Sequence, residues 1–140
     1  MNTTPNASFS ITNYVFDKIN IDLSKKGNDK LSLNFAPAGM FDEQTAIYEL
    51  TFNTEIKSED KNKPFILIRC KGLFRFQDIN SFSEIPDFFY NNSIAILFPY
   101  LRSYISLVTT QANIPGIILP TLNLSSLGKD LKENSTLKKD

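Results

Sequence analysis

The sequence predicts an α+β domain, in which a four-stranded antiparallel sheet packs against one long helix and a short C-terminal helix. Three observations favour this class. The first half of the chain alternates apolar and polar residues, as a strand with one buried face does. Polar turn-forming segments separate these alternating stretches. After residue 80, the apolar residues recur at the three- and four-residue spacing of a helix.

The first expected strand begins at Phe9 and ends near Leu23. Alternation places one set of apolar side chains on a shared face, and Asp17 interrupts that face. We therefore expect a bend near Asp17–Lys18. The apolar set consists of Phe9, Ile11, Val15, Ile19, Ile21 and Leu23.

Three further strands follow. Residues 31–35 predict the second strand, and the Pro37–Gly39 segment is expected to break or bulge it, because proline has no N–H to donate. Residues 48–56 alternate cleanly and predict the third strand, with one buried face. Residues 65–76 predict the fourth strand. Gly72 within it indicates either a bulge or the close approach of another backbone.

The helical part begins with a capping box at residues 81–84, which predicts a short helix over residues 85–90. The main helix is expected over residues 93–113. Pro99 either kinks this helix or marks its start, and the sequence leaves both alternatives open. Residues 123–131 predict a short final helix.

A chain of 140 residues has the size of one domain. We expect a disordered arm at residues 1–7, the folded domain at residues 8–128 and a charged, flexible tail at residues 129–140. Fifteen basic and fifteen acidic residues cancel, so charge gives no reason to expect nucleic acid or an anionic membrane as partner. No signal peptide pattern and no apolar run of ~20 residues is present, which favours a cytoplasmic protein without membrane insertion.

The composition argues against an enzyme. The chain has no histidine, which excludes Ser-His and Cys-His nucleophiles and most zinc sites. Its single cysteine, Cys70, excludes an internal disulfide and a thiol cluster. Catalysis by carboxylates or lysine alone stays open, but the adjacent acids Asp42–Glu43 and Glu59–Asp60 point in opposite directions and do not converge. We therefore expect no catalytic residues, no metal and no cofactor.

Apolar residues are more abundant than one small core requires. The main helix is apolar on more sides than a single sheet can cover. The loop over residues 114–122 is rich in proline and aliphatic residues, which predicts either a binding groove or a lid packed on the sheet. Met40 and Phe41 are interpreted either as core residues or as part of that groove's wall. The residues expected to contact a bound apolar partner are Met40, Phe41, Phe76, Ile114, Ile117, Ile118, Leu119 and Leu122.

The segment Ile96–Tyr100 (ILFPY), followed by Arg102, resembles the ILFPYxR segment of the SecB family of export chaperones. The order of the expected elements is also similar to that family. Weaker similarity covers residues 9–22 and 65–76. Further matching positions are an asparagine before the motif, a proline in the following loop and a Pro-x-Asn turn with one extra residue: Asn92, Pro115 and Pro120–Asn123.

The resemblance implies a homotetramer, built as a dimer of dimers through the first strand and the long helix. It also implies ATP-independent holding of unfolded or precursor polypeptides in long apolar grooves. In protein export it implies delivery to the SecA motor for translocation. The oligomer interface expected on this basis consists of Ile11, Val15, Leu97, Leu101, Tyr104, Ile105 and Val108.

The chain departs from the family at the surface that docks the motor. Asp22 matches one acidic docking position, whereas others fall on Lys18 and Leu67, and the last residues are rich in lysine. Chaperone activity therefore carries over better than SecA docking. Some family members guard antitoxins of toxin–antitoxin systems, so a chaperone dedicated to one partner is the first alternative. A small-ligand-binding domain on a curved sheet is the second.

Overall fold

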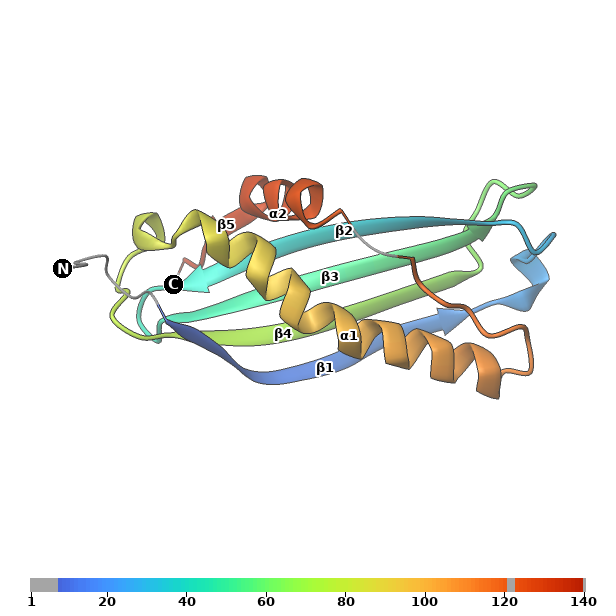
Figure 1. Cartoon of the computed structure of the whole chain (residues 1–140), viewed down its shortest axis with the longest axis horizontal. Coiled ribbons are helices and arrows are strands. Elements are labelled where there is room, and N and C mark those ends of the chain that lie inside the picture. The colour runs from blue at the N-terminus through green and yellow to red at the C-terminus, as the bar shows by residue number, and fades with distance from the viewer. Residues whose placement is uncertain (1–7, 121–122, 140) are drawn as a thin grey trace.

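The protein forms one sheet with two helices on the same face, as the computed structural model in Figure 1 shows. The structure describes residues 8–120 and 123–139. The strands lie in the order β1-β4-β3-β2-β5, with β1 and β5 at the edges. The elements are β1 (Phe9–Ile21), β2 (Leu31–Asp42), β3 (Ile47–Ser58), β4 (Ile66–Phe76), α1 (Asp87–Gln111), α2 (Leu124–Glu133) and β5 (Ser135–Leu137), with 3₁₀ turns at Leu23–Lys25 and Phe82–Glu84.

The four expected antiparallel strands are confirmed, but the sheet has a fifth strand and is mixed. β5 pairs with β2 in parallel, at residues 39–41. We expected a flexible tail from residue 129, whereas residues 129–133 complete α2 and the next residues form β5. The cause is a tertiary contact. Leu131 is buried, and the Tyr48 hydroxyl shares a hydrogen bond with the Ser135 hydroxyl, which holds the tail against β2. Residues 1–7 and Asp140 lie outside the described residues.

β1 contains two irregularities that alternation alone did not reveal. Its register against β4 shifts between Ile11 and Asn13 and again between Phe16 and Lys18. The second shift lies at Asp17, where the alternation was interrupted and a bend was predicted. The first reverses the side chains that follow it. Val15 therefore points away from the helices and Phe16 points toward them, opposite to the faces expected from the sequence.

β2 runs unbroken through Pro37, contrary to the expected break. Its register with β3 is continuous from residue 31 to residue 42. The hydrogen bond from the N–H of Gly39 to the carbonyl of Asn134 in the β5 segment shows which way the odd-numbered residues of β2 direct their backbone groups. The missing N–H of Pro37 thus faces the sheet edge and removes no bond to β3.

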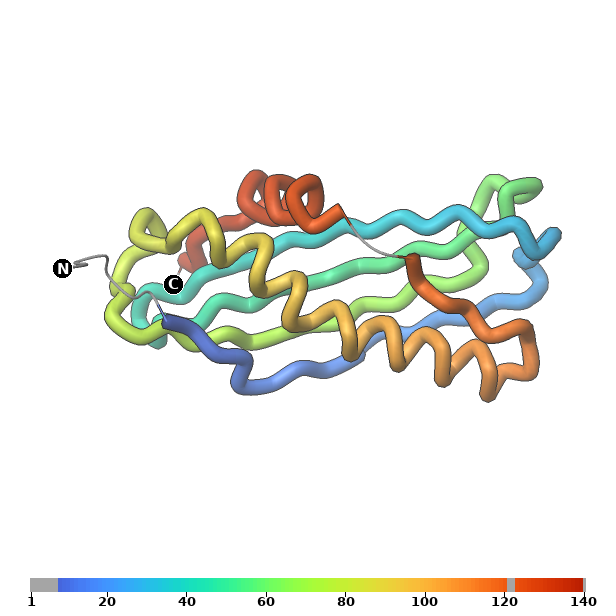
Figure 2. Tube along the Cα trace, in the orientation of Figure 1, coloured from blue at the N-terminus to red at the C-terminus, as the bar shows by residue number. Residues whose placement is uncertain are grey.

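The helix α1 crosses the sheet diagonally and ends over the β1 edge (Figure 2). It is one helix from residue 87 to residue 111, so Pro99 lies inside it and does not start it. Pro99 and Ala95, whose carbonyl loses a helical partner, are both on the exposed side of the helix. Gly72 lies close to a side chain of α1 and not to another backbone as expected, because a Cβ there would lie 3.2 Å from a methyl carbon of Leu97.

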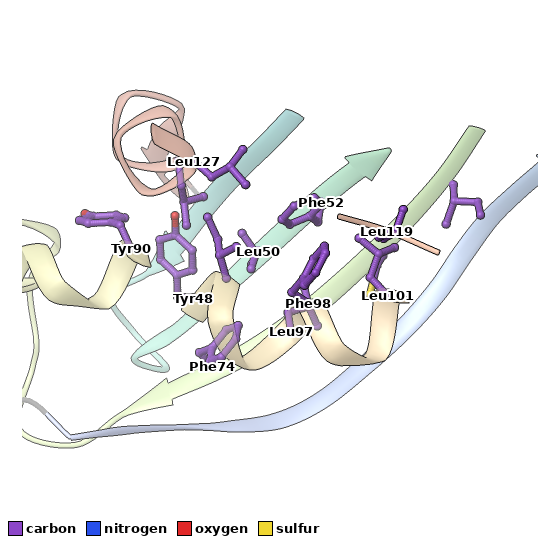
Figure 3. Packing of buried hydrophobic residues seen from close by; sticks show 14 of the residues in the cluster. Tyr48, Leu50, Phe52, Phe74, Tyr90, Leu97, Phe98, Leu101, Leu119 and Leu127 are labelled. Carbon is purple, nitrogen blue, oxygen red and sulfur yellow. The ribbon is translucent and has the colours of Figure 1, made fainter. Parts of the chain in front are cut away.

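The core lies between the helices and the sheet (Figure 3). Tyr48, Leu50 and Phe52 of β3 point into it and are completely buried, as the alternation predicted. Leu97 and Leu101 of α1 pack from the other side, so α1 is held by its own sheet. The fold thereby fixes the position of the loop that leaves α1.

Candidate functional site

The segment that follows α1 is extended and attached to the core at alternate positions. α1 ends at Gln111 with Ala112 as its C-cap, and Asn113 has a positive φ of 62°, which turns the chain back over the sheet. Ile117 and Leu119 are buried, whereas Ile118 between them is 83% exposed. We name residues 114–119 the return loop. It presents one large aliphatic side chain to solvent and uses two others as anchors.

The buried hydroxyl of Thr109 is one of the groups that connect the return loop to the helix. The Thr109 hydroxyl donates to the carbonyl of Ile105 at 2.8 Å and accepts from the N–H of Ile117 at 3.1 Å. Thr109 is completely buried. The loop is therefore fixed at the residue before Ile118, so the outward orientation of Ile118 is set by the backbone.

A cleft of about 230 Å³ separates the return loop from the start of β2. Its walls are mainly aliphatic. One wall comes from β2 and the other from the return loop, and Lys26 and Asp29 form one end. An apolar cleft with a few polar groups at one end is typical of a binding site. The lining residues are Lys26, Asp29, Leu31, Leu33, Ile114, Pro115, Gly116, Ile117 and Ile118.

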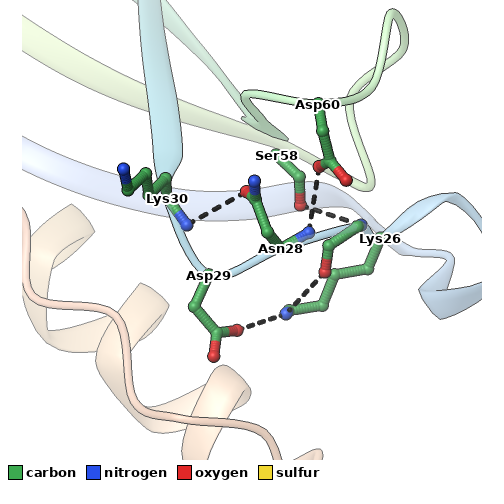
Figure 4. A network of polar contacts seen from close by, with 7 residues as sticks. Lys26, Asn28, Asp29, Lys30, Ser58 and Asp60 are labelled. Carbon is green, nitrogen blue, oxygen red and sulfur yellow. Dashed lines mark hydrogen bonds and ion pairs between the residues drawn. The ribbon is translucent and has the colours of Figure 1, made fainter.

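The polar end of the cleft is held by a network between two loops (Figure 4). The Lys26 ammonium contacts the Asp29 carboxylate at 2.6 Å and lies 5.8 Å from the centre of the Phe65 ring. The N–H of Gly27 donates to the Ser58 hydroxyl at 2.9 Å, and the N–H of Asn28 donates to Asp60 at 2.9 Å. The β1–β2 connection is thus tied to the β3–β4 connection, so this end of the cleft is preformed.

The residues predicted to contact an apolar partner separate into three groups in the structure. Ile114, Ile117 and Ile118 line the cleft, and Leu119 is buried beside it as an anchor. Phe41 and Phe76 are buried in the core, where their rings lie 5.8 Å apart, and have no surface for a partner. Met40 is exposed on the opposite face of the sheet. Leu122 lies outside the described residues.

Sequence reasoning missed Leu31 and Leu33, which form the β2 wall of the cleft. Their alternation was visible, and it correctly indicated a strand. Nothing in the sequence showed that the return loop would lie beside this particular strand. Phe41 and Phe76 were misplaced for a related reason, because an aromatic residue on a strand looks the same in a core and in a groove wall.

A second apolar surface extends from the side of α1 to β1. Leu107 is 55% exposed and Tyr100 is 40% exposed. The Tyr100 ring stacks on Tyr14 of β1 at 4.2 Å between centroids, and Tyr104 stacks on Phe16 at 4.0 Å. We name Tyr14, Ile96, Tyr100 and Leu107 the lateral patch. The helix spacing had indicated an apolar surface wider than one stripe, but the patch residues were not in the predicted interface.

The predicted interface residues are distributed differently. Leu97, Leu101 and Ile105 are completely or almost completely buried within the single chain, because the sheet covers their side of α1, so they have no surface to offer a second subunit. Ile11, Tyr104 and Val108 are half-buried. Val15 is 48% exposed on the open face of the sheet.

The open face of the sheet carries charged residues of both signs. The Asp17 carboxylate accepts two hydrogen bonds from Arg69, at 2.9 Å from Nε and 2.7 Å from Nη2, and lies 3.6 Å from the Lys71 ammonium. The predicted docking residue Asp22 caps the Leu23–Lys25 turn by accepting from the N–H of Ser24. Hydrogen bonds from the Ser24 hydroxyl and N–H lower the pKa of Asp22. Its carboxylate therefore has a local structural role.

Groups that could do chemistry are sparse in the described residues. No cluster of three or more acidic or cysteine side chains that could hold a metal occurs within residues 8–120 and 123–139. Burial raises the pKa of the Cys70 thiol to about 12, so the thiol is protonated at neutral pH and inert. None of the helices in the described ranges is long and apolar enough to cross a membrane.

Comparisons with known proteins identify relatives of this chain. The uncharacterized protein MJ0357 of Methanocaldococcus jannaschii is 34% identical over 89 residues, which cover 61% of this chain. The matched region spans 57% of the length of that relative. The Rv1957 SecB-like chaperone of Mycobacterium tuberculosis, solved in complex with a ChAD peptide from the Rv1956 HigA1 antitoxin, has a TM-score of 0.67. It is 16% identical, over 82% of this chain and 88% of that chain, and shows the shared fold.

The match to a family as a whole is more extensive than either of these. The family described as "Preprotein translocase subunit SecB" matches residues 8–134. These residues include every strand and helix of the structure except β5. The ILFPY segment that carried the resemblance lies in the middle of α1, where Leu97 and Phe98 pack on the sheet. The chain belongs to the SecB family.

Proposed function

We propose that this protein holds unfolded or precursor polypeptides without using ATP. The observation that carries the proposal is the position of Ile118, which is 83% exposed beside an aliphatic cleft of about 230 Å³. A large aliphatic side chain fixed in solvent contributes nothing to the stability of the free protein. It is available to an apolar segment of another chain, which gains free energy when the two surfaces meet.

The cleft suits partners of varied sequence. Its walls are aliphatic, so the favourable free energy of binding comes from burial of apolar surface. This contributes roughly 1.5–3 kcal/mol for each client side chain that becomes fully buried. Few side-chain hydrogen-bonding groups are available in it to select one client residue over another. The binding residues that we propose are Leu31, Leu33, Ile114, Ile117 and Ile118, with Leu119 as the buried anchor.

Self-association is the second part of the proposal. The lateral patch exposes aromatic and aliphatic side chains on α1 and β1, and apolar surfaces of this kind are typical of subunit contacts. We propose that copies of this chain associate through this patch and the β1 edge, as the dimer of dimers expected from the family. Several clefts on one particle would bind the same client together and slow its release.

Delivery to the SecA motor receives less support from this chain than client holding does. Asp22 is engaged by its own turn, and Arg69 and Lys71 bring positive charge to the face where the family carries acids. A dedicated chaperone of one partner is therefore the second candidate function. The observation that favours it is the similar fold of Rv1957, which was solved with a peptide from an antitoxin.

The test combines particle mass with suppression of aggregation. Light scattering would give the mass of the purified protein, and its effect would be measured on several unrelated unfolded proteins without nucleotide. A particle near four subunits that protects several of them supports the general chaperone. Protection of one partner only, with no effect on unrelated proteins, supports the dedicated chaperone. A monomer that protects none of them contradicts both.

A matched pair of variants connects the activity to the cleft. We expect Ile118→Ser to weaken protection, because it removes the exposed aliphatic side chain without disturbing the anchors on either side. Leu67→Ser serves as the control, because Leu67 is exposed on β4 on the opposite face of the sheet. Equal activity of the two variants would contradict the assignment of the cleft as the client site.

A further inference from the structure

The open face of the sheet carries an arginine that has no partner. Both helices lie on the other face (Figure 1). Arg75 lies near the end of β4 and is exposed, and its side chain makes no hydrogen bond or ion pair within residues 8–120 and 123–139. Arg69 and Lys71 of the same strand, by contrast, both contact Asp17. An unpaired arginine keeps its five N–H donors for a carboxylate, so Arg75 is suited to bind an acidic partner.

Polar side chains surround Arg75 and form a small hollow with it. The hollow has a volume of about 180 Å³ and is lined by Ser8, Phe9, Ser10, Arg75 and Gln77. Ser10 stands directly opposite Arg75 in the β1–β4 ladder. The Ser8 hydroxyl donates to the amide oxygen of Gln77 at 3.4 Å, and the N–H groups of that amide have no partner in the described part of the chain. Hydroxyl, amide and guanidinium donors thus converge on a space that suits a carboxylate. We name this space the Arg75 hollow.

A larger, mainly apolar hollow adjoins the Arg75 hollow on the same face. It has a volume of about 410 Å³, and Met40, Ile47 and Leu73 provide its apolar lining. Ile47 pairs with Arg75 in the β3–β4 ladder, and Leu73 precedes Arg75 by two residues, so the two hollows are neighbours. Met40 is 43% exposed, and its flexible thioether is a favourable contact for an aromatic ring. We name this space the Met40 hollow, and it has room for an aromatic side chain.

The charged groups around the Met40 hollow are already paired. The Asp42 carboxylate lies 3.8 Å from the Lys138 ammonium, and the Glu49 carboxylate lies 4.0 Å from the Lys71 ammonium. Each of these pairs is neutral, so the unbalanced positive charge beside the hollow is that of Arg75. A partner that fits both hollows therefore carries one acidic and one apolar side chain.

The distance between the two hollows determines the spacing of those two side chains. Arg75 is on β4 and Met40 is on β2, with β3 between them, which corresponds to about 10 Å across two strand spacings. An extended segment advances ~7 Å over two residues, and residues two positions apart point to the same side. The length of the side chains covers the remaining distance. An acid and an apolar residue two positions apart therefore match both hollows.

We propose that the two hollows bind an extended segment of a partner protein in which a carboxylate lies two residues from a large apolar side chain. The carboxylate pairs with Arg75, and the apolar side chain enters the Met40 hollow. The segment crosses the strands of the sheet and adds no strand to it. The return loop lies on the other face, so a partner docked here leaves the client cleft free. Lys18 and Leu67, where the family resemblance placed motor docking, lie toward the other end of β4.

A peptide of defined sequence tests the site on the intact protein. The probe GSESFSESG has a glutamate two positions from its phenylalanine on each side, so it fits in either direction. NMR titration follows the methyl groups of Met40 and Ile47 and the Nε–H of Arg75. The control peptide, GSQSFSQSG, differs only in charge. We expect the glutamate peptide to bind roughly fivefold more tightly at these groups, the effect of one exposed ion pair with its hydrogen bonds. Equal binding of the two peptides would overturn the inference.

Reversal of charge connects the preference to Arg75. We expect Arg75→Glu to bind GSKSFSKSG more tightly than the glutamate peptide, because the carboxylate now attracts the lysines. Lys18→Glu is the matched control, because Lys18 is also an exposed cation of the open face without a partner in the described ranges. That variant should keep the preference of the unaltered protein. An unchanged preference in Arg75→Glu, or a reversed preference in both variants, would contradict the assignment to the Arg75 hollow.

A second pair of variants tests the Met40 hollow. We expect Met40→Ser to bind the glutamate peptide roughly three- to tenfold more weakly, because the phenylalanine ring loses part of its apolar contact. Val15→Ser removes an exposed apolar side chain of the same face outside the hollow and should bind normally. Equal affinities of these two variants would overturn the inference. Inorganic phosphate that shifts Arg75 as the peptide does, with no response of Met40 to the peptide, would indicate a small-anion site and also overturn it.

Discussion

Asp17 and Arg69 form a two-bonded ion pair across the β1–β4 ladder, with N–O distances of 2.9 and 2.7 Å. Asp17 lies at the second register shift of β1, between Phe16 and Lys18. The residue that interrupted the apolar alternation in the sequence is therefore the one that ties this irregular point of β1 to β4. The hydrogen bonds from Arg69 hold the pKa of Asp17 at about 2, well below its ordinary value of 3.8.

This lowered pKa predicts how stability depends on pH. The ionised Asp17 favours the folded state above its unfolded pKa of 3.8, and its contribution disappears as the pH falls toward the folded pKa of about 2. We expect Asp17→Asn to destabilise the protein near neutral pH and to differ little from the unaltered chain at about pH 2. Urea unfolding at several pH values would measure this, with Glu55→Gln on β3 as the control. A difference that stays constant with pH would contradict the prediction.

Gly39→Ala is expected to destabilise the protein by about 1–3 kcal/mol, as overpacking of a core does. A Cβ at Gly39 would overlap the buried Tyr48 ring, which also holds Ser135 of β5. Urea unfolding would measure the cost in the unaltered chain and again in a Tyr48→Leu background, where space is available. If the ring is the cause, the cost falls in the second background. The same cost in both would show that the ring is not responsible.

Leu107→Glu is expected to dissociate the proposed assembly. Leu107 is the most exposed member of the lateral patch, and a carboxylate buried between subunits without a partner is strongly unfavourable. Sedimentation velocity would report the loss of particle mass. Phe88→Glu is the matched control, because Phe88 is 50% exposed near the start of α1 and outside the patch. Equal masses for the two variants would place the subunit contact elsewhere.

Cys70 is expected to resist thiol reagents while the protein is folded. Burial, with a smaller effect from the negative charge of Asp17, raises the pKa of its thiol to about 12, so little thiolate exists near neutral pH. Labelling with Ellman's reagent should be fast in denaturant and slow in its absence. Rapid labelling of the folded protein would contradict the buried position of Cys70 on β4.

The success of sequence reasoning depended on whether a strand contained irregularities. β3 has none, and the residues predicted to face the core, Tyr48 to Ile56, do so. β1 has a register shift after Ile11, which reversed the faces of Val15 and Phe16. The alternation of apolar and polar residues assumes that every residue of a strand is paired. It therefore cannot reveal an extra, unpaired residue that reverses the faces after it. The return loop was predicted correctly as an unusual segment, because its aliphatic residues exceed what a turn requires.

Features created by contacts between distant segments could not be predicted. Residues 135–137 contain one apolar residue and have no strand pattern of their own, so β5 exists only because the edge of β2 receives it. The β2 wall of the cleft depends in the same way on where the return loop lies. Phe41 and Phe76 were assigned to this wall because residue type alone does not distinguish a core residue from a groove residue.

The strand order determines how long β1 stays unpaired while the chain is being synthesised. β1 is made before the other strands of the sheet. Among the described residues it pairs only with β4, and Arg69, the partner of Asp17, lies 52 positions later in the chain. At ordinary translation rates this is a delay of roughly 3–10 s. During that interval Tyr14, Val15 and Phe16 leave the ribosome with no strand to pair with. A protein proposed to shelter the unfinished chains of others thus begins its own synthesis as such a chain.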